Sequence, residues 1–355
     1  MGTYLFRVDA NAIIGHGHVA RCTSLARQIK ELDNSAECIF LSRENTRYEN
    51  TFPDCELISI INLKRIDNDN YSALEECNDA YESLKIISNY HDPIVIVDSY
   101  DLGIIWEGMV SKFSKLLVVI CDIPSKPHEC DMLVNQNYNS ENSEYYKNYN
   151  KTTLLLGSKY SILPSKYKDL KKKSIIKKDI YHVMISFGGV DSRSITLLTL
   201  QSLIKYNKHA IKIYVTISDN HSNYKEIRNI SSKHNNVELH VNCNDLTALY
   251  EQIDIAFGNC GASLWERMAY GIPSFIISVT QIQKEIALSL YDSRFIFYIG
   301  HWNSINSINI LESFDSVMQN PVELTLASKN VSALIDGRGS ERVSKYILKK
   351  YRSND

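Results

Sequence analysis

The most specific chemistry in the sequence lies near the N-terminus, in Gly15-His16-Gly17-His18 with Arg21 one turn further on. Glycine lets the backbone approach a ligand closely, and the free N–H groups of a helix that begins here attract an anion. His18 lies at the helix entrance, and an unperturbed pKa of about 6.5 leaves a histidine largely neutral and able to accept a proton at neutral pH. The segment therefore predicts a ligand-binding turn with His18 as a general base.

Two other interpretations of this segment stay open. A histidine at the start of a helix is commonly a cap or a surface residue, and Gly-x-Gly-His also occurs by chance. A metal site is the second alternative, because a helix could bring His16, His18 and Cys22 together. No Cys-x-x-Cys partner or carboxylate pair completes that site. We therefore expect no metal and no cofactor.

A second informative segment spans residues 258–273, where small residues lead into a predicted helix that carries Glu266. A carboxylate there can accept two hydrogen bonds from a vicinal diol such as that of ribose. The backbone around Gly261, Ala262 and Ser263 would face a diphosphate. Equally, Glu266 could be an acidic residue in the first helical turn, where the helix dipole contributes about 0.3 to 1 kcal/mol.

The elements that position these residues alternate between strand and helix. Residues 93–98 and 116–122 are apolar runs that end in aspartate, a pattern typical of parallel strands buried on both faces. Such strands predict a doubly wound sheet, whose ligands bind at the carboxyl ends of the strands. An aspartate after a strand can equally be a helix N-cap. One sheet edge would hold His18 with Asp9, Asp98, Tyr100 and Asp122.

The pattern starts again in the second half of the chain. Residues 181–187 form a predicted strand, and Gly188, Gly189 and Asp191 make a glycine turn that is a second candidate phosphate cradle. The lysine-rich run before it is typical of a solvated linker. We predict an N-terminal Rossmann-like domain over 1–165, a linker over 166–179, and a C-terminal Rossmann-like domain over 180–355 whose last helix packs back on the first domain.

Composition limits the functional classes. A chain of 355 residues exceeds the size at which one core keeps growing, so two domains are expected. The net charge of −2 argues against nucleic-acid binding, which needs a basic face. The start of the sequence lacks a signal-peptide pattern, and no apolar run approaches the roughly 20 residues of a membrane span. We expect a cytoplasmic monomer that binds no membrane, with its 8 cysteines reduced and no disulfides.

A series of motifs resembles the UDP-2,4-diacetamido-2,4,6-trideoxy-β-L-altropyranose hydrolases of pseudaminic acid biosynthesis. The matching motifs are, in chain order, Arg7-x-Asp9, Gly15-x-Gly17-His18-x-x-Arg21-Cys22, Asp98-x-Tyr100, Trp106-Glu107, Pro127-His128-x-Cys130-Asp131, Asn135-Gln136-Asn137, Leu155-Leu156-Gly157-x-x-Tyr160, Phe187-Gly188-Gly189-x-Asp191, Trp265-Glu266-Arg267, Gly271-Ile272-Pro273 and Asp336-Gly337-x-Gly339-x-x-Arg342-Val343. Single motifs of this kind are common, whereas the full ordered series is specific. The sequence departs from the family at Cys121-Asp122, at Ile282-Gln283 and near Pro164, where the family carries an aspartate pair, an Asn-Gln pair and often an arginine.

The resemblance implies a GT-B fold, which is an α/β architecture of two Rossmann-like domains with an interdomain cleft. It implies metal-independent hydrolysis that breaks the anomeric C–O bond with inversion and gives UDP and the free sugar. His18 would be the catalytic base, and the C-terminal half would anchor UDP. The expected substrate-binding residues are Asp9, Gly15, Gly17, Arg21, Tyr100, Asn137, Gly188, Gly189, Asp191, Gly261, Ala262, Ser263, Glu266 and Gln283.

Two other functions remain open at this stage. A GT-B glycosyltransferase would share the fold and nearly all of these residues, with His18 deprotonating an acceptor hydroxyl instead of water. A non-catalytic protein that binds a sugar nucleotide would need the UDP-binding residues only. Release of UDP without an acceptor separates hydrolysis from both.

Overall fold

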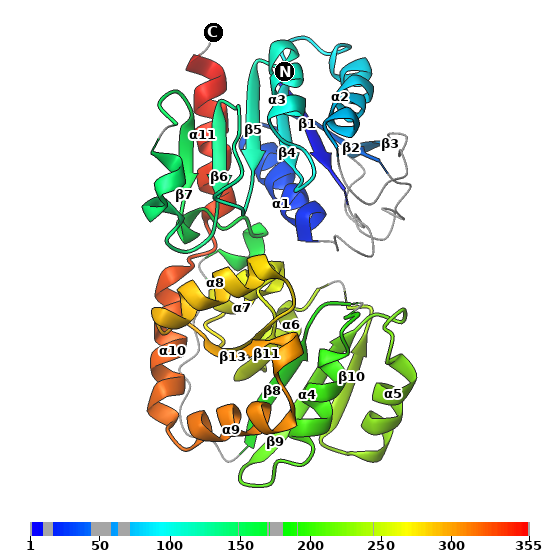
Figure 1. The fold of residues 1–355 in the computed structure, drawn as a ribbon, viewed down its shortest axis with the longest axis vertical. Coiled ribbons are helices and arrows are strands. Elements are labelled where there is room, and N and C mark those ends of the chain that lie inside the picture. The colour runs from blue at the N-terminus through cyan, green and yellow to red at the C-terminus, as the bar shows by residue number, and fades with distance from the viewer. Residues whose placement is uncertain are drawn as a thin grey trace. The chain divides into compact units, whose positions relative to one another are not determined.

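The computed structural model describes residues 2–9, 17–43, 58–62, 72–147, 149–168, 170, 180–189, 191–243 and 245–353. The chain forms two compact units (Figure 1). Unit 1 comprises Met1–Lys168 and Gly337–Asp355, and unit 2 comprises Asp169–Asp336. Residues 166–168 of the predicted linker thus belong to unit 1, and 171–179 lie outside the described residues, as does Gly15.

Unit 1 contains a seven-stranded sheet in which all neighbouring strands are parallel. Across the sheet the order is β3 (Ile58–Asn62), β2 (Glu37–Ser42), β1 (Thr3–Val8), β4 (Ile94–Asp98), β5 (Leu116–Ile120), β6 (Met132–Asn135) and β7 (Thr153–Leu156). The chain reverses its direction of winding between β1 and β4, so the predicted doubly wound sheet is confirmed.

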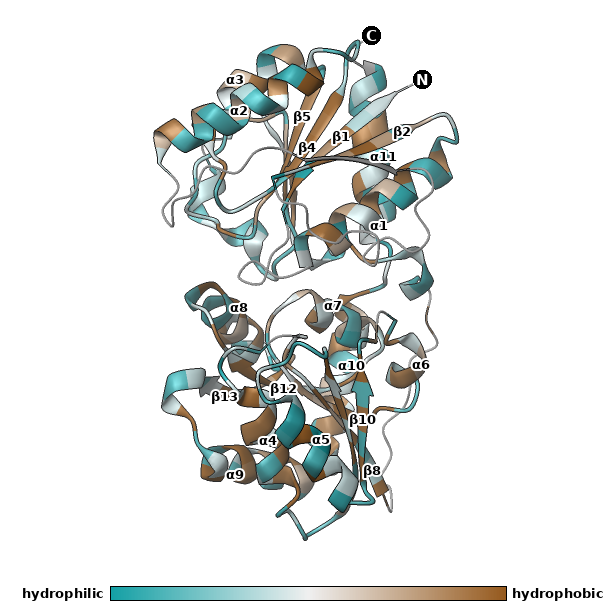
Figure 2. Cartoon of the chain, turned by 90° about the vertical axis from the view of Figure 1, so that its right-hand side faces the viewer, coloured by the Kyte–Doolittle hydropathy of each residue, from teal (hydrophilic) through white to brown (hydrophobic). Residues whose placement is uncertain are grey.

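Helices cover both faces of this sheet, and the alternation of side chains along the strands decides which face each residue meets. Even-numbered residues of β1 and β4, such as Phe6 and Ile96, belong to the core shared with α1 (Gly17–Leu32) and α11 (Gly339–Ser353). Odd-numbered residues, such as Leu5 and Val95, pack toward α2 (Ala73–Ile87) and α3 (Ile104–Val110). Figure 2 shows β4 and β5 brown, in keeping with burial on both faces.

The C-terminal helix α11 belongs to unit 1, where its Val343 and Ile347 are fully buried in the core that α1 shares. Two glycines allow the segment that leads into α11 to pack closely against the rest of unit 1. A Cβ at Gly339 would lie 2.0 Å from the carbonyl oxygen of Ser161, and one at Gly337 would lie 2.0 Å from that of Tyr167. The Asp-Gly-x-Gly motif of the sequence therefore serves close backbone packing.

Unit 2 contains a six-stranded parallel sheet with the same kind of winding. Its order is β10 (Val237–Val241), β9 (Ala210–Ile217), β8 (Ile180–Ser186), β11 (Ile255–Gly258), β12 (Ser274–Ser278) and β13 (Phe297–His301). Its helices are α4 (Ile195–Leu203), α5 (Tyr224–Lys233), α6 (Thr247–Tyr250), α7 (Ala262–Ala269), α8 (Gln281–Asp292), α9 (Ser307–Met318) and α10 (Pro321–Leu334).

Two of these helices, α9 and α10, fall in residues 303–334, which the sequence analysis left unassigned. Both have recognisable starts. Asn306 caps α9, because its side chain accepts the backbone N–H of Asn309 while the Asn309 side chain accepts that of Asn306. Pro321 occupies the first turn of α10, where a missing N–H costs nothing.

No helix in the described ranges is long and apolar enough to cross a membrane. Each of the seven cysteines that the structure describes is free.

Candidate functional site

The first candidate site lies in unit 1, where the winding of the sheet reverses. Val8 pairs with Asp98 across neighbouring strands β1 and β4, and α1 begins after β1. His18 is the second residue of α1, and Asp98 is the last residue of β4. Ligands of doubly wound sheets bind at this point, because the two connections leave the sheet in opposite directions.

His18 and Asp98 form a buried pair at this point. Nδ1 of His18 lies 2.6 Å from Oδ1 of Asp98, and His18 is 8% exposed. A carboxylate accepts only, so Nδ1 carries a proton, and in the neutral tautomer that this hydrogen bond favours the lone pair lies on Nε2. Asp98 thereby fixes the tautomer that a general base needs.

Arg21 holds Asp98 from a second direction. Its Nε and Nη2 donate to the two carboxylate oxygens of Asp98 at 2.5 and 2.7 Å, which is a bidentate pair. Nη1 donates to Oδ2 of Asp122 at 2.7 Å. Burial alone would lower the pKa of Arg21, but the two carboxylates outweigh it and raise that pKa. Burial would likewise raise the pKa of Asp98, yet Arg21 and then His18 hold it well below its usual range.

Asp122 connects the two other polar side chains of this edge. The phenol of Tyr100 donates to Oδ2 of Asp122 at 3.1 Å, and Nδ2 of Asn137 donates to the Asp122 carbonyl oxygen at 3.0 Å. The Tyr100 ring also meets the His18 ring edge-on, with centroids 4.7 Å apart. Burial and the Asp122 carboxylate raise the pKa of Tyr100, so its hydroxyl stays protonated. The structure thus brings together His18, Arg21, Tyr100 and Asn137 with Asp98 and Asp122.

Asp9 belongs to a different cluster. Its carboxylate accepts from Nη1 of Arg7 at 2.7 Å and from Nε of Arg43 at 2.9 Å. Arg7 is fully buried and also pairs with Asp79 of α2, at 2.6 Å. Burial would raise the pKa of Asp9, but Arg7 and Arg43 outweigh it and lower that pKa. Asp9 therefore belongs to an arginine–aspartate cluster that ties β1 to α2 through Arg7, and its partners in the described part of the chain do not include His18.

Strand alternation explains this separation. Asp98 and Asp122 continue the even-numbered positions of β4 and β5, which face α1. Asp9 continues the odd-numbered positions of β1, beside Arg7 and toward α2. All three aspartates follow strands at one edge of the sheet, but they point to opposite sides of it.

The second candidate site is the turn between β11 and α7 in unit 2. Gly261 is the N-cap of α7 with no side-chain hydrogen bond, and the first turn carries no acidic residue. Oδ1 of Asn259 accepts the N–H of Gly261 at 3.1 Å, and Nδ2 of Asn259 donates to the Phe187 carbonyl oxygen after β8 at 3.0 Å. Asn259 therefore links the loops that follow the two central strands. Gly261, Ala262 and Ser263 form the helix start, and Ala262 is exposed.

Glu266 lies one turn into α7 and is half-buried. Its Oε2 accepts the phenol of Tyr250 at 3.1 Å, and burial and the nearby carboxylate raise the pKa of Tyr250. Tyr250 is fully buried, so it fixes one side of the carboxylate from within the unit. This orientation suits a carboxylate that accepts hydrogen bonds from a diol.

The glycine turn after β8 has a different arrangement from the one the sequence suggested. Gly188, with φ +100°, and Gly189 are exposed, and a Cβ at Gly188 would meet no atom within 4 Å. Asp191, however, accepts the backbone N–H of Thr196 at 2.6 Å. Its carboxylate thus occupies the start of α4, where a phosphate would otherwise bind. Burial would raise the pKa of Asp191, but a hydrogen bond from His221 and those from the helix start lower it.

Gln283, in the first turn of α8, is also engaged locally. Its side-chain oxygen accepts the N–H of Val279 at 3.0 Å, and its own N–H donates to Oγ1 of Thr280 at 3.2 Å. These contacts cap α8.

Among the described residues, no group of three or more His, Cys, Asp or Glu side chains could hold a metal ion. His16, which the metal interpretation needs, lies outside them.

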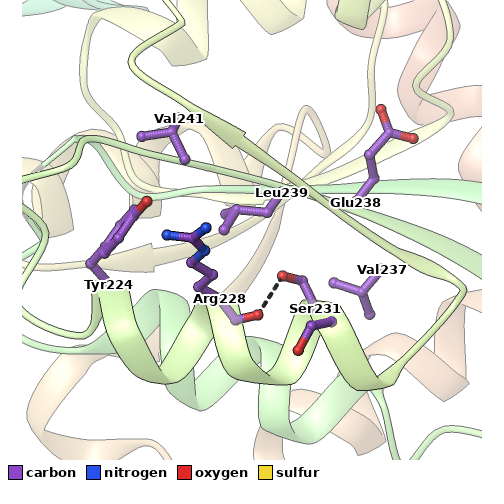
Figure 3. Close-up of a pocket in the computed structure, with 8 residues that line it drawn as sticks. Tyr224, Arg228, Ser231, Val237, Glu238, Leu239 and Val241 are labelled. Atoms are coloured by element: carbon purple, nitrogen blue, oxygen red, sulfur yellow. Dashed lines mark hydrogen bonds between the residues drawn. The ribbon is translucent and has the colours of Figure 1, made fainter.

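A shallow groove lies elsewhere on unit 2, between α5 and the edge strand β10 (Figure 3). Tyr224, Arg228 and Leu239 line it, and Oγ of Ser231 donates to the Arg228 carbonyl oxygen at 3.0 Å. None of the residues predicted to bind substrate lines this groove. It is therefore separate from the candidate sites.

The chain resembles known proteins in sequence and solved structures in fold. No family model matches the chain. The chain is 26% identical over 288 residues to the uncharacterized protein MJ1062 of Methanocaldococcus jannaschii, and the match covers 78% of this chain and 56% of that protein. The chain thus spans little more than half the length of that relative. It is also 24% identical over 249 residues to the UDP-2,4-diacetamido-2,4,6-trideoxy-beta-L-altropyranose hydrolase of Campylobacter jejuni, with coverage of 70% and 81%.

Solved structures show the fold. MurG of Acinetobacter baumannii aligns with a TM-score of 0.70 at 11% identity, covering 98% of this chain and 99% of that one. The MnaA–UDP structure from S. aureus aligns with a TM-score of 0.68 at 13% identity, covering 99% and 98%. The chain has the two-domain α/β GT-B fold, as the sequence predicted.

Proposed function

We propose that this protein hydrolyses UDP-2,4-diacetamido-2,4,6-trideoxy-β-L-altropyranose to UDP and the free sugar, without a metal and with inversion at the anomeric carbon. The observation that carries the proposal is the buried His18–Asp98 pair, with Nδ1 and Oδ1 2.6 Å apart. The similarity to the Campylobacter jejuni hydrolase, whose name states this substrate, supports the same choice.

In this reaction a water molecule attacks the anomeric carbon as the bond from that carbon to the diphosphate oxygen breaks. Nε2 of His18 takes one proton from the water, and the bonding electrons leave with UDP. Asp98 stabilises the imidazolium that forms, because its carboxylate already accepts the hydrogen bond from Nδ1. Arg21 keeps that carboxylate ionised and in place.

Unit 2 would bind the UDP moiety. Glu266 would accept hydrogen bonds from the ribose hydroxyls, and the N–H groups at Gly261 to Ser263 would bind the diphosphate. Donors that are already oriented stabilise the charge of the leaving group as it develops, which is commonly the largest contribution to catalysis.

The experiment is an assay of UDP release from the UDP-linked diacetamido sugar with no acceptor present. Enzymatic release supports hydrolysis. Release only after an acceptor alcohol is added would indicate a glycosyltransferase, and binding without release would indicate a sugar-nucleotide binding protein. Other UDP-sugars in the same assay define the substrate, and UDP-N-acetylglucosamine is the matched control.

A further inference from the structure

Three arginines are buried in the part of the chain that the structure describes, and one of them differs from the other two. Arg7 and Arg21 each form ion pairs with two aspartates at 2.7 Å or less. Arg267 is fully buried, yet no described carboxylate lies within 4.0 Å of its guanidinium. An arginine keeps its charge inside a protein, so unit 2 contains a buried cation that the Glu266 carboxylate attracts through space but that no described carboxylate contacts.

The partners of Arg267 all belong to the turn at α7 or to the strand beside it. Nη1 donates to Oγ of Ser263 at 3.0 Å and Nη2 donates to the Asn259 carbonyl oxygen at 3.1 Å. Nε donates to Oγ of Ser274 in β12 at 3.1 Å. Arg267 therefore holds both ends of the segment from Asn259 to Ser263, which is the segment proposed to bind the diphosphate.

Gly258 leaves the space that this guanidinium occupies. A Cβ at Gly258 would lie 2.8 Å from Nη2 and 2.9 Å from Nη1 of Arg267, so any larger residue there would displace it. Burial lowers the pKa of Arg267. The ion pairs of Arg21 have the opposite effect and raise its pKa. An anion at the turn would add to the attraction that Glu266 exerts on Arg267.

We propose that Arg267 is a positioning residue for the diphosphate of the bound nucleotide: it orients the turn through Asn259 and Ser263 and supplies positive charge that no described ion pair neutralises, without touching the ligand. The Ser263 hydroxyl accepts from Arg267, which leaves its own proton free to donate to a phosphate oxygen. This inference rests on the proposed function, because it assumes that unit 2 binds a nucleoside diphosphate.

The test compares ligands that differ only in phosphate, using the full chain. Binding of UDP and UMP is measured by calorimetry, and binding of uridine by ligand-observed NMR. We expect Arg267→Gln to weaken UDP binding about 10- to 100-fold, the range that one charge-assisted interaction provides, with uridine affinity within about twofold of wild type. Arg228→Gln removes one charge from the exposed side of α5 and should leave all three affinities unchanged.

The outcomes are distinguishable. Equal loss of UDP and uridine binding in Arg267→Gln would show a merely structural role, and unchanged UDP binding would also overturn the inference. If Arg267→Gln does not fold, Ser263→Ala replaces it, and a loss for UDP but not for uridine is again expected, whereas equal effects on both would refute the inference. Wild-type protein that binds neither UDP nor uridine would instead refute the proposed function.

Discussion

Oδ1 of Asp98 lies 2.6 Å from Nδ1 of His18, so the last residue of β4 fixes which ring nitrogen of the second residue of α1 carries the proton. The relationship crosses 80 positions of sequence and depends on the parallel pairing of β1 with β4. It assigns Nε2 as the basic atom.

Replacement of His18 should remove the base and spare nucleotide binding. In His18→Gln we expect kcat to fall by roughly 10²- to 10⁴-fold, the usual contribution of general base catalysis. The UDP dissociation constant, measured by calorimetry, should stay within about threefold of wild type, because the proposed UDP contacts come from unit 2. Full activity in His18→Gln would refute the assignment.

Asp98→Asn should leave the histidine in place with the wrong tautomer. The amide can donate to Nδ1, which would move the ring proton to Nε2 and disable the base, so kcat should fall by roughly 10²- to 10⁴-fold. The matched control is Asp101→Asn on the same loop, which loses only a partly exposed pair with Arg43, 3.3 Å long. The tautomer itself can be read from the ¹⁵N chemical shifts of the ring, and an unchanged ring in Asp98→Asn would contradict the mechanism.

Acid should destabilise the protein through Asp9 and Asp98. Ion pairs lower both pKa values in the folded state below the unfolded value of about 3.9. The stabilisation is thus fully present above about pH 5 and is lost as pH falls toward the folded-state pKa values, on the order of a few kcal/mol in total. Chemical denaturation between pH 7 and pH 3 measures it. Asp9→Asn should give a shallower decline, and an equally steep one would show that Asp9 contributes nothing to it.

Glu266 should discriminate between nucleotides by their ribose. Glu266→Gln should bind UDP about tenfold more weakly, because a carboxylate accepts stronger hydrogen bonds than an amide. The affinity of the same variant for 2′-deoxy-UDP should be close to the affinity of the wild-type protein for 2′-deoxy-UDP. Tyr250→Phe controls for the orientation of the carboxylate, since it removes only the 3.1 Å hydrogen bond to Oε2. Equal losses for both nucleotides would place the ribose elsewhere.

Isotope labelling identifies the bond that breaks. In water enriched in ¹⁸O, mass spectrometry should find the label in the free sugar and none in UDP, because water attacks the anomeric carbon. Label in UDP would mean attack at phosphorus, and His18 would then need another role.

Much of the unit 1 site follows from sequence alone. Apolar strands that end in aspartate placed Asp98 and Asp122 at one sheet edge with His18, and the structure joins them through Arg21. Asp9 lies at the same edge but points to the other side of the sheet. Counting alternate residues from Leu5 and Arg7 along β1 shows that Asp9 faces α2, where Arg43 and Asp79 complete its cluster.

Other parts depend on contacts that no local pattern reveals. Asp191 follows a glycine turn, which is typical of a phosphate-binding loop, but its carboxylate caps α4 instead. Gln283 is also engaged locally, because its side-chain oxygen accepts the N–H of Val279, just before the N-cap Thr280 of α8. The burial of Arg267 without an ion pair could not be predicted, because it depends on Gly258 and Ser274, which adjoin Arg267 only after β11 and β12 pair.

The membership of α11 in unit 1 has a consequence for how this protein folds. All of unit 2 separates that helix from α1 along the chain, and Val343 and Ile347 complete the core beneath α1. During synthesis, all strands of unit 2 are therefore made before α11 is available to complete the core of unit 1. The core around the helix that carries His18 is completed only by a segment made more than 300 residues later, so truncation before Gly339 should leave unit 2 folded and unit 1 incomplete.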